Sequence, residues 1–304
     1  MKKLPLYLRE MRAPFFTASV IPVILGASVA WSETGLFLPG LFALTLVAGM
    51  CLHAGTNVAN DYFDHKSGDD EINVEFVSPF TGGSRLIQKG LLTPREVLVE
   101  SLVLFAIGGA VGVYLAATRG LAILVLGVVG AFCGFFYTSP TVNIAARGIG
   151  ELTVGLNFGT LMVLGAYYVQ TGRFSTAAFL ASLPVTLLIA DVLYINEFPD
   201  CAADKAVGKT HLVARLGKER AVWGYLALTL AAYVSILVPV VARAVPPYCL
   251  LGLLTLPIAM KAINVAVTNY ADSPKLAPAN AATIQLHMLT GLLVSAGFIL
   301  DRVL

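Results

Sequence analysis

Polar residues gather at the end of a long apolar segment. Asn57, Asn60, Asp61 and Asp64 stand within about two helical turns, after residues 36–55, which include no Asp, Glu, Lys or Arg. On a helix, positions 57, 61 and 64 follow the i, i+4, i+7 pattern, so one amide and two carboxylates share a face. Carboxylates at the edge of a hydrocarbon layer are costly, so we expect them to face a partner, a cavity or a metal. A polar helix end that only caps into water is the alternative interpretation.

A second stretch repeats this pattern. Asn196, Asp200 and Asp204 close another long apolar segment and fall at i, i+4 and i+8, again on one helical face. Two acidic clusters at two membrane-helix ends repel each other unless cations lie between them. Mg2+ suits such a place, because it binds one or two carboxylates and completes its shell with substrate phosphate and water. The two clusters together predict a site that holds a metal-bridged phosphate ester at a membrane surface.

The composition places the chain in a membrane. Of the 304 residues, 57% are hydrophobic and only 12% are charged, about half the charge of a soluble domain, and the mean hydropathy is +0.81. We expect an all-α integral membrane protein, a single domain over residues 1–304 with pseudo-repeat halves at about 14–138 and 149–300. The apolar runs predict about nine transmembrane helices, at 14–32, 36–60, 95–117, 120–138, 149–170, 174–198, 220–242, 246–268 and 278–300.

The distribution of Lys and Arg predicts the orientation. These residues concentrate at the N-terminus and in the loops after the second, fourth, sixth and eighth spans, and both acidic clusters lie on the same side. By the positive-inside rule, this side is the cytoplasmic face of the cell membrane. The opposite side carries Arg119, Arg173, Arg243 and Arg302. A short interfacial helix is expected over residues 1–13, and its basic residues are Lys2, Lys3, Arg9 and Arg12.

A basic loop follows each acidic cluster. Lys66 and Arg85 follow the first cluster, and Lys205 and Lys209 follow the second. Carboxylate-bound metal on one side and Lys or Arg on the other is the arrangement that a diphosphate needs. Each single cation is explained equally well as part of the positive-inside topology signal, in which it binds no ligand. Within the second motif, Pro199 is expected to interrupt the helix and so to widen the site or shape a gating loop.

Four further polar residues lie within or at the ends of the spans. Tyr137 either faces the cavity or anchors its helix at the interface, as aromatic rings do. Asp191 is either functional or hydrogen-bonded to a neighbouring helix. We interpret His53 and His287 as packing residues, because no second histidine stands at a metal-binding spacing. The sequence contains no nucleic-acid motif and indicates no obligate protein partner.

The two acidic motifs resemble the signatures of the UbiA superfamily of intramembrane aromatic prenyltransferases. The resemblance rests on Asn57-x-x-Asn60-Asp61-Tyr-Phe-Asp64 and Asn196-x-x-x-Asp200-x-x-x-Asp204-x-x-x-Gly208-Lys209. It continues through Arg12-Ala-Pro14, Tyr137-Thr-Ser-Pro140, Arg147-Gly-Ile-Gly-Glu151 and Leu212-Val-Ala-Arg215-Leu-Gly217. Within the family, the branch that prenylates 1,4-dihydroxy-2-naphthoate on the way to menaquinone is the most similar, through Gly-Ser-Arg85-x-x-Gln88-x-Gly90 and Tyr167-Tyr-Val-Gln170-Thr-Gly172.

The chain departs from the family pattern at two places. The first motif often has a further acid one turn on, where this chain has His65 or Gly68. The second motif has Asn196-Glu197-Phe198-Pro199 where the naphthoate branch usually has Asn-Asn-x-Arg. Both departures concern the aromatic substrate more than the chemistry of prenyl transfer.

The resemblance implies a helical bundle around a central cavity. It implies Mg2+-dependent transfer of a polyprenyl group from an isoprenyl diphosphate to an aromatic acceptor such as 1,4-dihydroxy-2-naphthoate. The catalytic residues would be Asp61, Asp64, Asp200 and Asp204, and the metal ligands Asn57, Asp61, Asp64, Asn196, Asp200 and Asp204. The substrate-binding residues would be Asn57, Asn60, Lys66, Arg85, Tyr137, Arg147, Asn196, Lys205 and Lys209. An apolar cavity would protect the allylic cation from water.

Other functions remain open at the level of sequence. The acceptor can be another hydroxyaromatic compound or lipid, such as the 4-hydroxybenzoate of ubiquinone biosynthesis. A transporter of an anionic lipid or metabolite also has repeated halves and polar residues in broken helices. Both acidic clusters lie on one side of the membrane rather than at its midplane, which favours an enzyme. A membrane phosphatase or phosphotransferase would need other signatures, such as a phosphohydrolase histidine pair, which the sequence does not show.

Overall fold

Long, nearly parallel helices form the molecule. The computed structural model describes residues 3–304, so Lys2 lies outside the described residues. Within this range, eight helical segments are long and apolar enough to cross a membrane, and no residue is in a strand. A shorter apolar helix, α6 (Leu121–Phe135), occupies the predicted fourth span with 15 residues. The all-helical membrane fold is confirmed, and the expected number of about nine corresponds to these eight segments plus α6.

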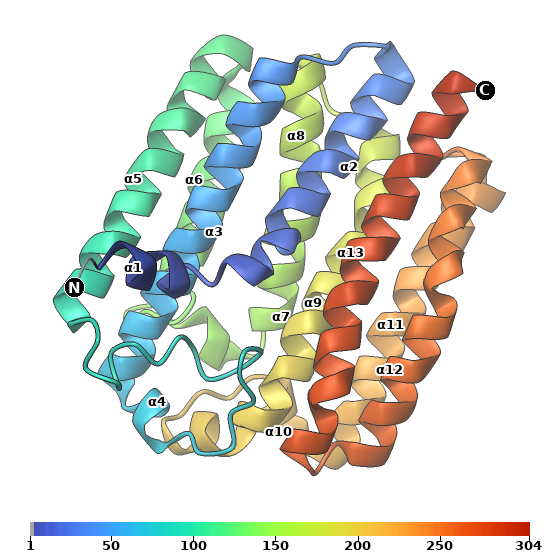
Figure 1. Ribbon diagram of the computed structural model, residues 1–304. Coiled ribbons are helices and arrows are strands. Elements are labelled where there is room, and N and C mark those ends of the chain that lie inside the picture. Colours follow the sequence, from blue (N-terminus) through green and yellow to red (C-terminus); the bar gives the residue numbers. More distant parts are fainter. Residues whose placement is uncertain (1–2) are drawn as a thin grey trace.

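The elements follow one another mostly as antiparallel neighbours (Figure 1). The part of the chain up to α6 contains α1 (Leu4–Glu10), η1 (Ala13–Phe16), α2 (Thr17–Thr34), α3 (Pro39–Ser67), α4 (Asp69–Ile72) and α5 (Pro94–Arg119). The next part contains η2 (Ile144–Arg147), α7 (Gly150–Gly155), the π-helical turn η3 (Leu156–Leu161), α8 (Met162–Thr171) and α9 (Thr176–Ala206). The last part contains α10 (Leu212–Leu216), α11 (Lys218–Val241), η4 (Pro247–Thr255), α12 (Leu256–Asn269) and α13 (Ser273–Val303).

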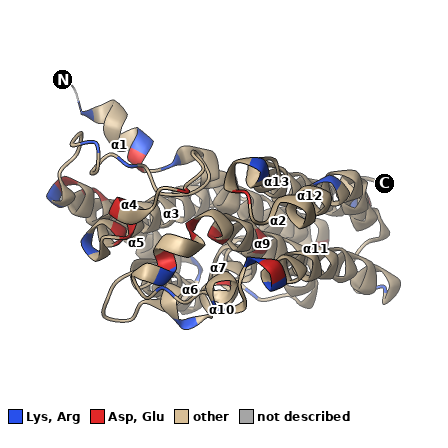
Figure 2. Cartoon of the chain, turned by 90° about the horizontal axis from the view of Figure 1, so that it is seen from below, with Lys and Arg blue, Asp and Glu red and all other residues tan. Residues whose placement is uncertain are grey.

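The long connections gather at one end of the bundle. In Figure 1 the segments with α4 and α10 lie at the lower end, whereas the C-terminus lies at the upper end. Figure 2 looks onto the lower end and shows charged residues around α3, α4, α9 and α10. The predicted N-terminal helix is present as α1, whose residues Leu6 and Tyr7 pack against a buried apolar cluster that includes Leu86 and Val97. This packing fixes α1 against the side of the bundle, beside α3 and α5 (Figure 1).

The helices that carry the acidic motifs extend beyond their predicted apolar spans. α3 has 29 residues and continues to Ser67, and α9 has 31 residues and continues to Ala206. The acidic residues therefore lie on rigid helix rather than on loops. α3 ends at Gly68, which has a φ of 79° and whose amide donates to the carbonyls of Asp64 and His65. Glycine tolerates this left-handed conformation at a helix end.

The prediction that Pro199 interrupts its helix is wrong. Pro199 lies inside the continuous helix α9. Proline has no amide hydrogen, so the carbonyl of Ile195 loses its normal partner four residues along the helix. Asn280 of α13 supplies the missing donor, with its Nδ2 atom 3.2 Å from the Ile195 oxygen and 2.7 Å from Oδ1 of Asn196. A side chain from another helix thus allows α9 to continue through the motif.

We expect Asn280→Ala to lower the stability of the protein, because it leaves the Ile195 carbonyl buried without a donor. The cost of one such unsatisfied group is about 1–3 kcal/mol, and the measurement is the melting temperature of detergent-purified protein. Adding Pro199→Ala to Asn280→Ala restores an amide donor inside α9 and should recover part of the loss. Asn269→Ala is the control, because within residues 3–304 that side chain bonds only to the carbonyl of Val265 in its own helix. If Asn269→Ala and Asn280→Ala lowered the melting temperature equally, the hydrogen bond from Asn280 to Ile195 would not be the reason for the loss of stability.

Candidate active site

An apolar cavity of about 560 Å³ runs into the bundle from the acidic end. Its walls come from η1, α2, α3, α5, α6, α7, η3, α8 and α9, and the small residues Gly127, Gly130 and Gly134 of α6 make room for it. Arg12, Asn57, Asn60, Tyr137 and Asn196 line its polar end. The cavity follows α3 from Asn57 to Thr45, a length of about 18 Å at 1.5 Å per residue. It therefore joins a polar mouth to a long apolar interior.

The first acidic motif lies at this mouth. The side chains of Asn57 and Asn60 line the cavity, and Asn60 donates to Oδ2 of Asp64 at 2.8 Å. Asp61 is 3% exposed, and its Oδ2 accepts the amide of Ser84 at 2.7 Å. Its other oxygen, Oδ1, has no hydrogen-bond partner among the described residues. A buried carboxylate oxygen without a donor is a suitable ligand for a hard cation.

The second acidic motif faces the first from α9. Asn196 lines the cavity. Asp200 accepts a hydrogen bond from Asn73 Nδ2 at 2.7 Å, so the segment after α4 reaches across to α9. Asp204 is buried and lies 3.1 Å from Nε2 of His211. The structure therefore brings the two predicted motifs together around one site.

Lys209 connects the two motifs. Its ammonium group is 2.5 Å from Asp64 Oδ1 and 3.5 Å from Asp204 Oδ1, and it also contacts Asp69. Burial alone would lower the pKa of Lys209, but the carboxylates of Asp64, Asp204 and Asp69 outweigh that effect and hold its pKa well above the ordinary lysine value. A permanent positive charge therefore lies between α3 and α9, where the sequence predicted that a cation is needed.

Several acids near the mouth titrate at unusually high pH. Burial raises the pKa of Asp69 to about 7, although Lys209 opposes the shift. Burial, together with the charges of Asp64 and Asp61, raises the pKa of Asp70 to about 9. Burial and the charge of Asp61 raise the pKa of Glu10 to about 8. This end of the bundle thus has more acidic groups than its own cations neutralise, a condition that favours binding of metal cations.

The loop between α4 and α5 covers the first motif. Its residue Gly83 has a φ of 66°, and a Cβ atom there would lie 2.8 Å from Asp61 Oδ1. The predicted ligand Arg85 lies in this loop, but its guanidinium donates to the carbonyls of Asp70 and Asn73 and lies 4.1 Å from the Phe76 ring centroid. In this structure Arg85 holds the loop in place rather than facing the cavity.

Other predicted cations lie outside the cluster. Lys66 and Lys205 are exposed. Arg147 is exposed as well, and its Nε donates to the carbonyl of Val142 within its own turn. Of the four loop cations proposed to face a diphosphate, only Lys209 is buried among the acidic residues. Their contacts with substrate stay predictions.

Sequence reasoning overlooked several residues at this end. Arg12 was noted only as a basic residue of the N-terminal helix and as part of a family signature, yet it lines the cavity, with Nη1 3.9 Å from Asp61 Oδ1. Asp69 and Asn73 contact Lys209 and Asp200, respectively. The adjacent acids Asp69 and Asp70, directly after the glycine that ends α3, were the available signal. Glu151, Glu197 and His211 also converge, as three buried groups.

Comparison with known proteins decides the family. The model of the UbiA prenyltransferase family matches residues 19–289. The chain belongs to the UbiA prenyltransferase family. This confirms the predicted family and the prediction that the protein is an enzyme that transfers prenyl groups.

Named relatives of this UbiA-family chain cover nearly its whole length. It is 28% identical to the 2-carboxy-1,4-naphthoquinone phytyltransferase of Synechocystis, over 96% of this chain and 92% of that protein. It is also 28% identical to the 1,4-dihydroxy-2-naphthoate octaprenyltransferase of Bacillus subtilis, over 94% and 89% of the two chains. A UbiA homologue from Archaeoglobus fulgidus, solved with GPP and Mg2+, superposes with a TM-score of 0.64 at 16% identity, over 95% and 99% of the chains. The last comparison confirms the fold.

We expect Gly83→Ala to impair prenyl transfer, because the new methyl group collides with the Asp61 carboxylate. Gly90→Ala is a matched control, since Gly90 also has a φ of 66° but has open space where a Cβ would be. Both variants carry the same backbone strain, of order 1 kcal/mol, and only Gly83→Ala displaces Asp61. The measurement is the rate of prenyl transfer at saturating metal, with melting temperatures as a check on folding. Equal rates in the two variants would contradict a close approach of this loop to Asp61.

Proposed function

We propose that this enzyme transfers a polyprenyl group from an isoprenyl diphosphate to 1,4-dihydroxy-2-naphthoate. One observation carries the proposal: the apolar cavity begins where the two acidic motifs meet, and Arg12 is the cation among its lining residues. A diphosphate, an apolar chain and a carboxylated ring need these three environments side by side. The relative from Bacillus subtilis is named for 1,4-dihydroxy-2-naphthoate and the one from Synechocystis for 2-carboxy-1,4-naphthoquinone, and both names support a carboxylated two-ring acceptor.

The acidic end is the proposed diphosphate site. The residues that would hold Mg2+ are Asn57, Asp61, Asp64, Asn196, Asp200 and Asp204. They fit the ion, because they offer amide and carboxylate oxygens and because Oδ1 of Asp61 is buried without a donor. When bound, Mg2+ would neutralise the diphosphate and stabilise the charge that develops on the leaving group. The Archaeoglobus homologue of the same fold was solved with GPP and Mg2+, which supports a divalent metal ion beside the diphosphate.

The apolar part of the cavity is the proposed site of the prenyl chain. Side chains such as Leu52, Phe105 and Met162 line it, and they offer the substrate no nucleophile. When the bond between the prenyl C1 and the diphosphate oxygen breaks, the allylic carbon becomes electron-deficient, and water would capture it. The apolar walls exclude water during this step. The diphosphate leaves toward the acidic end with both bonding electrons.

Arg12 is the proposed anchor of the acceptor. Its guanidinium lies 4.9 Å from the centroid of the Phe15 ring, and both residues line the cavity. The only carboxylate that it pairs with among the described residues is Asp61, at 3.9 Å, so its donors can also bind the carboxylate of a substrate. A ring held here would face the C1 end of the prenyl chain. A ring carbon then forms the new bond to C1, and the ring loses a proton, or CO2 when the attacked carbon bears the carboxylate.

The orientation of the enzyme follows from the same site. In Figure 1, α4 and α10 lie at the lower end of the bundle, and the N-terminal helix α1 lies at its side, beside α3 and α5. The excess of Lys and Arg in the connections at this end supports a cytoplasmic position. We therefore place the diphosphate site at the cytoplasmic face of the cell membrane, where water-soluble acceptors and Mg2+ are available.

The first test uses purified protein in detergent with Mg2+ and a labelled polyprenyl diphosphate. We expect a prenylated product with 1,4-dihydroxy-2-naphthoate, none with 4-hydroxybenzoate, and none after EDTA. Asp61→Asn and Asp200→Asn should each lower the rate by at least about a hundredfold while the protein stays folded. Product with 4-hydroxybenzoate alone would show that the proposed acceptor is wrong, although the type of reaction would stand. Diphosphate uptake into vesicles without any product would favour a transporter.

We expect Arg12→Gln to raise the KM for the naphthoate acceptor by at least about tenfold, because a charge-assisted hydrogen bond contributes about 1.5–3 kcal/mol. The KM for the prenyl diphosphate should change little. Arg9→Gln is the control, since Arg9 is an exposed cation on α1. The same assay with 1,4-dihydroxynaphthalene, which lacks the carboxylate, should show no difference between Arg12→Gln and the natural protein. An equal change in KM with both acceptors would instead show that Arg12 acts by maintaining the structure of the cavity mouth.

A further inference from the structure

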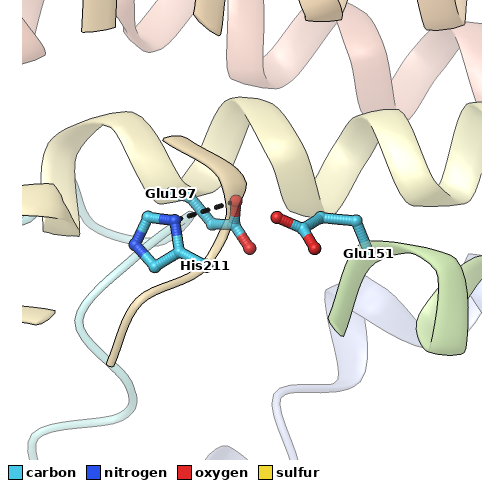
Figure 3. Close-up of side chains that lie close together, drawn as sticks. All are labelled: Glu151, Glu197 and His211. Carbon is cyan, nitrogen blue, oxygen red and sulfur yellow. Dashed lines mark ion pairs between the residues drawn. The ribbon is translucent and has the colours of Figure 1, made fainter. Parts of the chain in front are cut away.

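A second group of ligand-type side chains lies beside the diphosphate site. Glu151 belongs to α7, Glu197 to α9, and His211 stands just before α10. One ligand atom from each residue lies within 4.8 Å of the others, and all three residues are buried. Figure 3 shows the Glu197 carboxylate between the imidazole ring and the Glu151 carboxylate, which points toward it. None of these residues is among the predicted ligands of Mg2+ or diphosphate.

The two carboxylates lack enough donors for their burial. Glu151 is only 3% exposed. Its Oε1 accepts the amide of Leu212 at 2.8 Å, but its Oε2 has no hydrogen-bond partner among the described residues. Glu197 is 7% exposed, and its Oε2 lies 3.2 Å from Nδ1 of His211, a contact that is an ion pair only when the imidazole is protonated. This oxygen has no hydrogen-bond partner among the described residues. The imidazole of His211 faces both Glu197 and Asp204, so it cannot by itself neutralise Glu151 and Glu197 as well. Two buried carboxylates that face each other therefore require a further positive charge.

The imidazole is already oriented as a metal ligand. Nε2 of His211 lies 3.1 Å from Asp204 Oδ2, and Nδ1 faces Glu197. Metal-binding histidines commonly hold the second ring nitrogen to a carboxylate in this way, which fixes the ring and makes it a better ligand. Nδ1 also accepts the amide of Ala214 at 3.2 Å. A metal at Nδ1 would replace this capping hydrogen bond.

We propose that Glu151, Glu197 and His211 bind a divalent transition-metal ion such as Zn2+ or Mn2+, at a site separate from the diphosphate-bound Mg2+. Imidazole together with carboxylates suits these ions, whereas Mg2+ prefers oxygen ligands alone. The ion connects the start of α7, the end of α9 and the segment before α10. It thereby fixes the segment that carries Lys209 against the second acidic motif. The proposal goes beyond prenyl transfer and does not depend on the acceptor.

The test uses full-length protein in detergent, stripped with a chelator and titrated with Mn2+ in the absence of substrate. Pulsed electron paramagnetic resonance detects a coupling to 14N only when Mn2+ has a nitrogen ligand. We expect this coupling in the natural protein and its loss in His211→Asn. Asparagine keeps a side-chain oxygen that can cap α10, because Asn is a favoured residue at helix starts. Glu151→Gln and Glu197→Gln should each weaken Mn2+ binding at this site by at least about tenfold.

His287→Asn is the matched control, because His287 is a buried histidine whose Nε2 has no hydrogen-bond partner among the described residues. It should keep the 14N coupling. The proposal would be overturned if the natural protein showed no 14N coupling, or if His211→Asn kept it. A proton shared between Glu151 and Glu197 would then be the explanation for their burial. If His211→Asn does not fold, Glu151→Gln decides, since unchanged Mn2+ affinity there would also overturn it. None of these readouts measures prenyl transfer, so failure of the proposed function would leave them unaffected.

Discussion

The buried ammonium group of Lys209 is the interaction on which the acidic end depends. It contacts Asp64 of α3 and Asp69 of α4, and it lies 3.5 Å from Asp204 of α9. Without it, two helices would bring several carboxylates together in a region with little water, and their repulsion would separate the helix ends. In the function proposed above, the same excess of acid binds the metal cations that hold the diphosphate.

A rigid frame keeps these charges in place. Both acidic motifs lie on helices of about 30 residues, α3 and α9, so each side chain has a fixed position relative to the membrane. α9 continues through Pro199 because Asn280 supplies the donor that proline cannot. The loop over α3 adds the amide of Ser84 to Asp61. Carboxylates held by such contacts need little rearrangement when a substrate binds, which favours stabilisation of the transition state.

The site combines two environments that normally exclude each other. Its acidic end has carboxylates, Lys209 and loop amides, whereas the cavity behind it is lined mainly by apolar side chains and glycines. An allylic diphosphate needs both, because its head is a multivalent anion and its reactive carbon must be kept from water. Arg12 lies at the junction of the two regions. The cluster of Glu151, Glu197 and His211 contacts the acidic end through His211, whose Nε2 lies 3.1 Å from Asp204 Oδ2.

The sequence by itself determined the helical membrane fold, the approximate spans and the two acidic faces. These features are local: an apolar run of about 20 residues has few structures open to it in a bilayer, and the spacing of Asn57, Asp61 and Asp64 places them on one face of any helix. Only the tertiary structure decided which basic residue turns inward, that Pro199 stays within a helix, and that Glu151 meets His211. Each of these depends on groups that are distant along the chain, and residue spacing carries no information about such contacts.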